Sequence, residues 1–331
     1  MVAHHSYYAK KMMNKKNKLK LIFKLILTTF LLFFFFRRVD LKSLSETLLS
    51  MPLSFFVKAG LLYLAAYFVN TLKWFQLLEN ISLIKLFLFT LVAQYYTLVL
   101  PGGQVTGEAV KIYKLGKGRQ DAEKIAASVI IDRITGFIGI MIVGISGLIR
   151  SETHQTKHMA LWFATAAIIL TMGLYLFQFR LFEQTVTKAL IFIKQASDKT
   201  TILVDQCFRF IKAWKDYLKK PFVLLKSLLL GIIFQFICVC ISMVLAKAFD
   251  IDISFSDWCW IFCVISVALY LPVTIGGIGV REGCFVLLLG YFGVSAEKAL
   301  ALSLSLFSLR VFVALIGGIV DFRMDYKRKE E

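Results

Sequence analysis

The sequence has little charge. Only 18% of its 331 residues are charged, whereas about a quarter are charged in a typical soluble domain. Hydrophobic residues make up 58%, and long apolar runs recur along the whole chain. Because a helix needs about 20 apolar residues to cross the hydrocarbon core, this composition excludes an ordinary soluble protein. It favours an all-α protein that crosses a membrane several times.

Acidic residues are the scarcer charged type: 21 Asp and Glu stand against 39 Lys and Arg, for a net charge of +18. Such a basic excess occurs in nucleic-acid-binding proteins, but in a membrane protein it follows from the enrichment of Lys and Arg in cytoplasmic loops. Anionic lipid headgroups are a second expected partner of these residues. We therefore predict a protein of the cell (cytoplasmic) membrane with no nucleic-acid partner.

Motifs for catalysis are also missing. The chain has no GxxxxGK[ST] loop for ATP, and its apolar runs contain no histidine. Six cysteines lie almost entirely in apolar segments, and no histidine or second cysteine pair accompanies them as metal ligands would. They are interpreted as small buried hydrophobic residues. We expect no metal, no cofactor and no enzymatic activity.

Eight apolar segments are long enough to span the bilayer. They comprise residues 19–36, 53–72, 82–100, 125–149, 159–179, 222–249, 257–275 and 297–320. The first has no small-residue cleavage site after it, so it is predicted to remain as a span. Two shorter segments, 101–116 and 279–293, join the third span to the fourth and the seventh to the eighth.

Basic residues decide how the short segments are placed. The connection 180–220 holds nine Lys or Arg and repeats apolar residues at helical spacing, which is typical of an amphipathic helix on the cytoplasmic surface. If both short segments cross, this connection, the basic N-terminus 1–18 and the basic tail 322–331 all face the cytoplasm. If both turn back, 180–220 faces outward, against the charge rule. We therefore predict that both cross, that residues 19–321 form one transmembrane domain, and that both termini are cytoplasmic.

The two short segments belong to related motifs, at 101–133 and 272–310. A shift of 174 residues aligns glycine pairs, glutamates and an AEK triplet: Gly102–Gly103 with Gly276–Gly277, Glu108 with Glu282, and 122–124 with 296–298. In the predicted topology the two copies cross in opposite directions. The fold is therefore predicted to hold about eight full transmembrane helices plus two short broken or re-entrant helices in inverted repeats, an architecture that places binding sites near the midplane.

The glycine breaks predict a binding site. Inside a membrane a broken helix is tolerated only where it is buried in protein or lines a wet cavity. In GGIGVREG, residues 276–283, free N–H groups at a helix start and Arg281 favour an anion such as phosphate. Glu282 is expected to pair with a cation or to position Arg281. The candidate substrate-binding residues are Gly102, Gly103, Gln104, Glu108, Lys111, Asp132, Arg133, Gly276, Gly277, Gly279, Arg281, Glu282 and Arg310.

Charges within the apolar runs have two interpretations. Asp132, Arg133 and Arg310 each cost at least a few kcal/mol at such depth, so they line a pathway or form structural ion pairs between helices. Both remain open for these residues. Lys73 and Lys85 lie near predicted helix ends and are expected to extend along the apolar surface with their charge in water.

Three stretches carry a resemblance to a known family. They are PGGQVTGEAVKIYKLG at 101–116, ASVIIDRITG at 127–136, and PVTIGGIGVREG at 272–283 with GVSAEKALALSLSLFSLR at 293–310. From about residue 20 to 321 the chain resembles the flippase-like family named after the transmembrane part of lysylphosphatidylglycerol synthase. It departs mildly at Val105 and Thr106, where further small residues are common. Because the chain ends at Glu331, the soluble synthase domain of two-part members is expected to be absent.

The resemblance implies movement of a lipid between leaflets, such as an aminoacylated phosphatidylglycerol or a polyprenyl-phosphate sugar. We expect a flippase for an anionic or phosphate-bearing lipid whose headgroup enters a cavity between the repeats. Arg281, Lys111 and glycine N–H groups would hold the phosphate. Glu108, Asp132 and Glu282 would act as countercharges or proton-coupling sites.

Two other functions stay open. The first is a membrane scaffold that holds enzymes of lipid or glycan biosynthesis, with the basic segment 180–220 as the docking surface. The second is an integral-membrane transferase acting on a lipid-linked sugar. A transferase would need an acidic cluster for a nucleotide donor, and the DID at 250–252 lies on a short, predicted outer connection.

Overall fold

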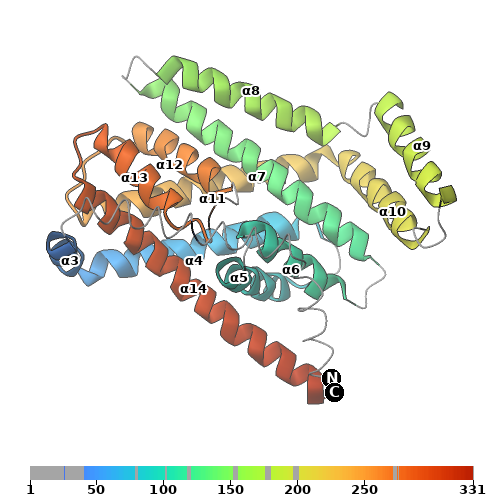
Figure 1. The fold of residues 1–331 in the computed structure, drawn as a ribbon, viewed down its shortest axis with the longest axis horizontal. Helices are drawn as coiled ribbons and strands as arrows, with labels where there is room; N and C mark the ends of the chain where they lie inside the picture. The colour runs from blue at the N-terminus through green and yellow to red at the C-terminus, as the bar shows by residue number, and fades with distance from the viewer. Residues whose placement is uncertain are drawn as a thin grey trace.

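The computed structural model describes residues 26, 41–78, 81–100, 103–117, 121–151, 156–175, 180–196, 201–270, 274 and 276–330. Those residues form twelve helices and no strand, which confirms the predicted all-α class (Figure 1). The helices are α3 (Leu41–Leu49), α4 (Leu53–Phe75), α5 (Leu83–Val99), α6 (Gln104–Gly116), α7 (Ala122–Arg150), α8 (Thr156–Tyr175), α9 (Arg180–Ala196), α10 (Thr201–Leu218), α11 (Pro221–Lys247), α12 (Phe255–Tyr270), α13 (Val280–Gly290) and α14 (Ala296–Glu330). The N-terminus 1–18 and the first predicted span, 19–36, lie outside the described residues apart from Ile26.

Four helices of the described part are long and apolar enough to cross a membrane: α4, α7, α11 and residues Ala296–Met324 of α14. They account for four of the predicted spans, 53–72, 125–149, 222–249 and 297–320. The predicted spans 82–100, 159–179 and 257–275 correspond to shorter apolar helices, Leu83–Val99, Ala160–Tyr175 and Phe255–Tyr270. The chain is thus a multi-pass membrane protein, and the total of eight full spans stays a prediction.

Prolines explain why two of these helices are short. α5 ends at Val99 and α12 ends at Tyr270, in each case two residues before a proline, Pro101 or Pro272. Proline disfavours a helical backbone in the residue before it, and Leu100 accordingly has an extended backbone, with φ of −95° and ψ of 141°. The same proline–glycine sequences that predict broken helices therefore also limit the length of the helices before them.

α7 is the central helix of the fold. Its most apolar stretch is 67% buried within the protein, whereas that of α4 is only 22% buried. α4 therefore turns most of its apolar surface outward, as a lipid-facing helix does. Glycines let α12 approach α7 closely, because a Cβ built on Gly147 would lie 2.4 Å from the backbone oxygen of Ser256. The close contact fixes α12 beside the C-terminal half of α7 (Figure 1).

The two halves of the chain are interlocked. α5, from the first half, packs against α14 from the second, and α12, from the second half, packs against α7 from the first. α4 and α11 pack against each other between them. The α5–α14 contact is also backbone-close, since a Cβ on Gly317 would lie 2.0 Å from the carbonyl oxygen of Leu91. Each short helix is therefore supported by a long helix from the other half.

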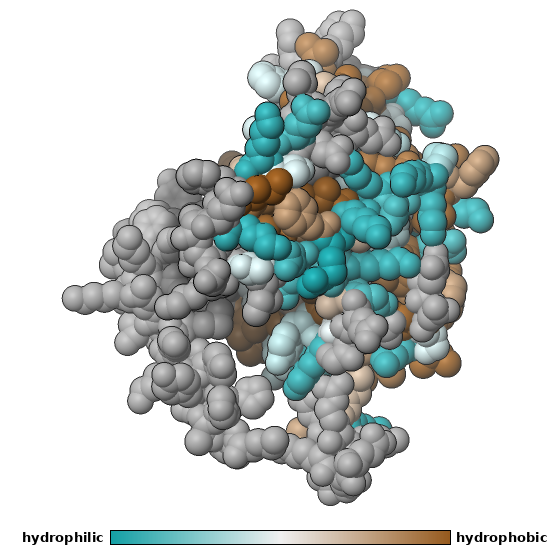
Figure 2. All heavy atoms as spheres, turned by 90° about the vertical axis from the view of Figure 1, so that its right-hand side faces the viewer, coloured by the Kyte–Doolittle hydropathy of each residue, from teal (hydrophilic) through white to brown (hydrophobic). Residues whose placement is uncertain are grey.

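The basic connection 180–220 forms two helices, α9 and α10, at one end of the molecule (Figure 1). α10 packs its apolar face on α7 and α11. The Trp214 indole donates a hydrogen bond to the Leu174 carbonyl at 3.0 Å, and the Tyr217 hydroxyl donates to the Leu77 carbonyl at 2.5 Å. Lys212 and Lys219 are exposed, and Figure 2 shows hydrophilic side chains gathered at this end. The cytoplasmic location of this face stays a prediction.

Candidate functional site

Two helix pairs build the site. α5 packs against α6, and α12 packs against α13; we call these pairs the first and second hairpin. Both α6 and α13 follow a glycine with positive φ, Gly103 at 59° and Gly279 at 88°, a conformation that L side chains rarely adopt. The glycines thus allow the chain to turn sharply into each short helix.

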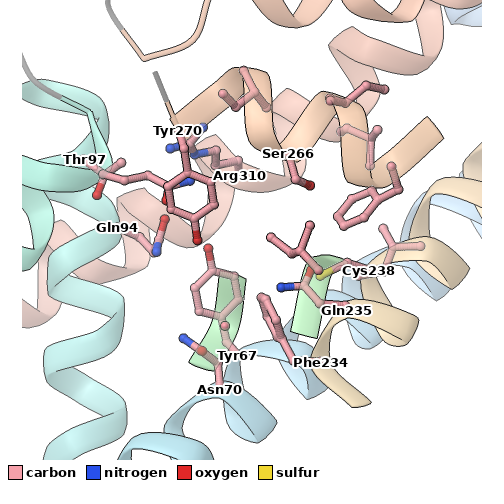
Figure 3. Close-up of a pocket in the computed structure, with 18 of the residues that line it drawn as sticks. Tyr67, Asn70, Gln94, Thr97, Phe234, Gln235, Cys238, Ser266, Tyr270 and Arg310 are labelled. Atoms are coloured by element: carbon pink, nitrogen blue, oxygen red, sulfur yellow. The ribbon is translucent and has the colours of Figure 1, made fainter. Parts of the chain in front are cut away.

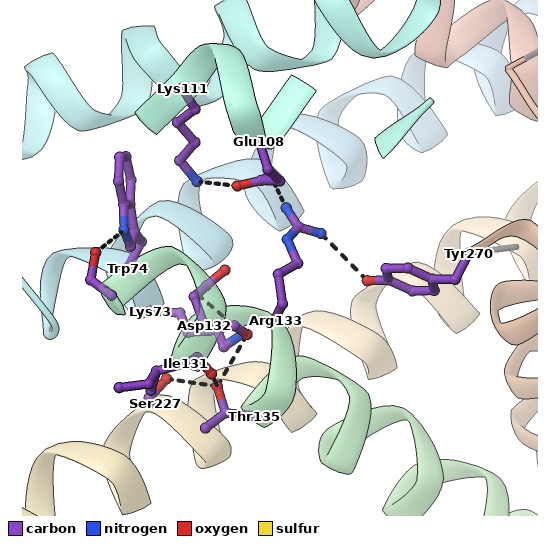
Figure 4. A network of polar contacts seen from close by, with 11 residues as sticks. Lys73, Trp74, Glu108, Lys111, Ile131, Asp132, Arg133, Thr135, Ser227 and Tyr270 are labelled. Carbon is purple, nitrogen blue, oxygen red and sulfur yellow. Dashed lines mark hydrogen bonds and ion pairs between the residues drawn. The ribbon is translucent and has the colours of Figure 1, made fainter. Parts of the chain in front are cut away.

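The hairpins meet halfway along α7. From the C-terminal end of α7, α12 follows its surface to Tyr270, whose ring centroid lies 4.0 Å from that of Phe137. From the N-terminal end, α6 follows α7 from Gly116 to Glu108, whose carboxylate pairs with Arg133. Arg133 also donates to the Tyr270 hydroxyl at 3.4 Å (Figure 4). Arg133 therefore joins the two hairpins at the point where both end.

A cavity of about 230 Å³ lies at this junction. Its charged lining consists of four cations and two carboxylates: Lys73, Arg133, Arg281 and Arg310, with Glu108 and Asp132. Its uncharged polar lining includes Asn70, Gln94, Thr97, Gln104, Gln235, Ser242 and Ser266. Aromatic rings line it as well, among them Tyr63, Tyr67, Phe234, Phe262 and Tyr270. Figure 3 shows Gln94, Asn70 and Gln235 reaching the same space from three different helices.

The first hairpin contributes a charged cluster that links three helices. Besides Arg133 on α7, the Glu108 carboxylate has Lys111 Nζ at 3.5 Å. That ammonium group also lies 3.7 Å from the centroid of the Trp74 ring on α4, in a cation–π contact. The Trp74 indole in turn donates to Ser128 at 3.0 Å (Figure 4). Glu108 thus neutralises two cations from different directions.

Lys73 corrects an expectation from the sequence. Instead of reaching water, its side chain is only 3% exposed and its Nζ lies 3.1 Å from Asp132 Oδ1, an ion pair whose alignment is not that of a hydrogen bond. It donates instead to the Asp132 backbone carbonyl. Glycines make room for it: a Cβ on Gly136 would lie 3.1 Å from Lys73 Nζ, and one on Gly231 would lie 3.4 Å from its Cε. Nothing in the spacing of the sequence brings these glycines and Lys73 together.

The second hairpin forms a self-contained charged group. The Glu282 carboxylate pairs with the neighbouring Arg281 and accepts the Gly279 N–H at 2.6 Å. Arg281 Nε donates to Ser303 of α14 at 3.0 Å, and its guanidinium lies 4.3 Å from the Phe307 ring centroid. Glu282 therefore occupies the helix start at which the sequence predicts a bound anion, and Arg281 reaches the cavity while its charge is already balanced.

Arg310 differs from the other cations of the cavity. It lies on α14 and lines the cavity close to Tyr270 (Figure 3). With the described residues it forms neither an ion pair nor a hydrogen bond, whereas Lys73, Arg133 and Arg281 each have a carboxylate partner. Arg310 is thus a half-buried guanidinium whose N–H donors have no acceptor among the described residues.

Six of the thirteen predicted site residues line the cavity: Gln104, Glu108, Asp132, Arg133, Arg281 and Arg310. Lys111 and Glu282 stand behind them as ion-pair partners. Gly103, Gly276, Gly277 and Gly279 shape the hairpin turns but are not part of the lining, and Gly102 lies outside the described residues. Sequence reasoning missed Lys73, Tyr270 and three of the cavity amides, because single polar residues in apolar helices do not reveal which face they occupy. These amides are Asn70, Gln94 and Gln235.

The fold and the cavity define a multi-pass membrane protein with a polar site inside its helix bundle. Comparison with protein families gives a match over residues 21–318 to the family described as lysylphosphatidylglycerol synthase TM region. The chain belongs to this family. Comparisons with curated proteins and with solved structures gave no match.

Proposed function

We propose that this protein moves a phosphate-bearing lipid between the two leaflets of the cell membrane. The observation that carries the proposal is Arg310, a cation with no carboxylate partner among the described residues, which lines a cavity where two hairpins meet. An unpaired charge in a membrane protein is costly, so it is retained where a ligand or pathway uses it. A phosphate has the negative charge and the pair of acceptor oxygens that a planar guanidinium binds with two parallel hydrogen bonds.

The size of the cavity supports binding of a headgroup alone. Pockets for drug-sized ligands have about 300–1,000 Å³, so a cavity of about 230 Å³ takes a phosphate with a small attached group and excludes long acyl chains. The apolar outer surface offers a place for those chains, because Leu53, Leu61 and Phe312 are all more than half exposed. The headgroup would therefore pass through the protein while the chains remain in the bilayer.

The interlocked helices support an inverted repeat, which would give the transporter two alternating states. α4 to α7 correspond in order to α11 to α14, and α7 and α14 both begin at an AEK triplet, 122–124 and 296–298. The α5–α14 contact of one half has its counterpart in the α12–α7 contact of the other. In such an architecture a site at the junction of the repeats is opened alternately to the two sides. The hairpin tips, where a Cβ added to Gly276 would lie 3.9 Å from the Leu98 side chain, would separate in one of the two states.

Transport in reconstituted vesicles tests the proposal. The full chain is placed in liposomes that contain phosphatidylglycerol with a fluorescent acyl chain, and dithionite added outside reports the lipid that reaches the outer leaflet. The assay is run without a gradient and with a proton gradient of either sign. Wild type is expected to accelerate the movement over protein-free vesicles. Arg310→Gln is expected to slow it at least about tenfold, since hydrogen bonds to charged groups contribute about 1.5–3 kcal/mol.

Lys212→Gln serves as the matched control, because it removes one positive charge from the exposed face of α10, outside the cavity lining. It should leave the rate unchanged. A wild-type protein that does not accelerate lipid movement under any of the three conditions would overturn the proposal, and a protein that only holds partner enzymes together would give that result. Equal rates for wild type and a folded Arg310→Gln variant would remove Arg310 from the site.

A further inference from the structure

The charges of the cavity do not balance. Together with the ion-pair partners behind the lining, the site holds five cations, Lys73, Lys111, Arg133, Arg281 and Arg310. It holds three carboxylates, Glu108, Asp132 and Glu282. Five positive charges less three negative charges leave a net charge of +2 in a region sheltered from water. Such a site attracts an anionic ligand and repels a cationic ligand group.

All three carboxylates already have partners. Glu108 pairs with Arg133 and Lys111, and Asp132 pairs with Lys73. Glu282 pairs with Arg281 and also accepts a backbone N–H. Glu108 Oε2 and Asp132 Oδ1 accept no hydrogen bond from the described residues, but each already lies within 3.5 Å of a lysine ammonium group. A ligand ammonium group would therefore share its carboxylate with a lysine, and it would enter beside Arg310, which has no ion-pair partner among the described residues.

The cavity instead offers amide groups that lack partners. Asn70, Gln94 and Gln235 reach it from α4, α5 and α11, and none of them forms a hydrogen bond with any described residue (Figure 3). Gln235 is only 4% exposed, so its amide is withdrawn from outside solvent and faces the cavity. A fourth amide, that of Gln104, lines the same cavity, and its Oε1 is buried without a hydrogen-bond partner among the described residues. An unpaired buried polar atom is costly unless a ligand or water satisfies it. A primary amide both donates and accepts, which matches a hydroxyl group.

From this juxtaposition we infer that the cargo headgroup is a phosphate ester whose remaining part is uncharged and rich in hydroxyls, and that headgroups bearing an amine are rejected. The inference rests on the proposed function, because it assigns the ligand class of the same cavity. Arg310 holds the phosphate and the three amides hold the hydroxyls. The rings of Tyr67 and Tyr270 provide apolar faces for the C–H groups between them. A glycerol and a sugar-like ring share this chemistry.

Binding of four dioctanoyl lipids to the purified full chain in detergent tests the inference. The probes are phosphatidylglycerol, phosphatidylinositol, lysylphosphatidylglycerol and phosphatidic acid, with affinity measured by titration. Phosphatidylglycerol or phosphatidylinositol should bind at least about tenfold more tightly than lysylphosphatidylglycerol, a difference of about 1.4 kcal/mol. Whichever of the two binds more tightly identifies a glycerol or a ring as the hydroxyl-bearing group. Phosphatidic acid, which lacks the hydroxyl-bearing group, should bind more weakly than the preferred lipid.

Two sets of variants separate the parts of the site. Arg310→Gln should lower the affinity for every phosphate lipid, and the difference in affinity between the preferred and the lysyl lipid should fall to about threefold or less. Arg310→Lys keeps the charge and should keep the order of affinities. Gln235→Leu should lower the affinity for the preferred lipid and leave the affinity for phosphatidic acid unchanged. Thermal unfolding midpoints identify any variant that fails to fold. The lipid affinities of the variants that do fold are then compared with those of wild type.

The outcomes distinguish this inference from the proposed function. If the lysyl lipid binds wild type as tightly as phosphatidylglycerol or more tightly, while vesicle transport still depends on Arg310, the headgroup assignment is wrong and the flippase proposal stands. If a folded Gln235→Leu variant binds all four lipids as wild type does, the amides are not the hydroxyl site. If no probe binds and no vesicle shows transport, both proposals fail.

Discussion

The two hairpins use the same residue types for different purposes. In the first, Glu108 reaches out of its own helix to Arg133 on α7, and Arg133 extends to Tyr270 of the second hairpin. In the second, Glu282 pairs with its neighbour in the chain, Arg281, and caps the start of its own helix. The first glutamate therefore connects helices, whereas the second completes one helix start.

This difference shows why aligned residues need not have equal roles. Glu108 and Glu282 occupy the same place in the sequence repeat, yet α13 begins at Val280, two residues before Glu282, and α6 begins at Gln104, four residues before Glu108. Glu282 is close enough to the helix start to accept its N–H groups, and Glu108 is too far along. Because α6 starts farther from its glutamate, Glu108 is free to contact α7. The first hairpin is therefore the one that is linked through Arg133 to the second hairpin.

The largest expected effect comes from Glu282→Gln. It leaves Arg281, whose side chain is only 6% exposed, without a carboxylate, and removal of one partner of a buried pair costs about 3–5 kcal/mol. The free energy of unfolding, measured by SDS titration in mixed micelles, should fall by that amount. Replacing both residues in Arg281→Leu/Glu282→Leu should restore most of it.

Glu108→Gln is the corresponding change in the first hairpin and should cost less, about 1–3 kcal/mol. Arg133 is 27% exposed on its side chain and keeps its hydrogen bond to Tyr270. Its guanidinium therefore remains partly solvated when the carboxylate is lost. Lys111, whose side chain is 1% exposed, also loses its carboxylate but keeps its cation–π contact with the Trp74 ring. A loss of stability equal to that of Glu282→Gln would mean that the two ion pairs are equally buried in solution, against the comparison drawn above.

A smaller effect is expected from Gly107→Ala in the first hairpin. A Cβ there would lie 2.0 Å from Thr97 Oγ1 and 2.5 Å from the Ala93 carbonyl oxygen, so α5 and α6 must move apart, at a cost of about 1–3 kcal/mol. In the second hairpin, Gly290→Ala meets no atom within 4 Å and should change stability by no more than about 0.5 kcal/mol. The same SDS titration compares the two, and equal losses would contradict the tight α5–α6 packing.

Apart from the Gly290→Ala control, the smallest expected effect is that of Tyr270→Phe, which removes the hydrogen bond between Arg133 and the second hairpin. At 3.4 Å this bond is long, and its loss should cost about 0.5–1.5 kcal/mol. The consequence for transport is the more informative measurement. If the bond holds the hairpin tips together, the vesicle assay should give a changed rate for Tyr270→Phe, while Phe137→Leu, which keeps the hydroxyl, should preserve it.

The elements of this fold follow closely from sequence because the signals are local. Apolar runs of helical length predict α4, α7, α11 and α14, and the prolines at 101 and 272 predict where α5 and α12 end. The basic, periodic pattern of 180–220 predicts an amphipathic helix, and the structure has two helices there, α9 and α10. How deeply a hairpin enters the bundle is not local information, since it depends on contacts such as that of Gly317 with Leu91.

The site was predictable only in part, for a related reason. Buried charges such as Asp132, Arg133 and Arg310 are conspicuous in apolar segments, so the sequence identifies them as candidates. Which charges pair is decided by helices that are distant in sequence: Lys73 meets Asp132 because Gly136 and Gly231 leave space for its side chain. That Arg310 has no carboxylate partner among the described residues is equally a property of the assembled bundle.

The interlocked packing has a consequence for biosynthesis. The first hairpin rests on α14, where Gly317 receives the Leu91 backbone and Asp321 pairs with Lys114. α14 follows all the other described helices in the sequence, so it leaves the ribosome after them. The first hairpin therefore enters the membrane before its supporting helix exists, and the two halves complete their structure together, only after α14 has been made.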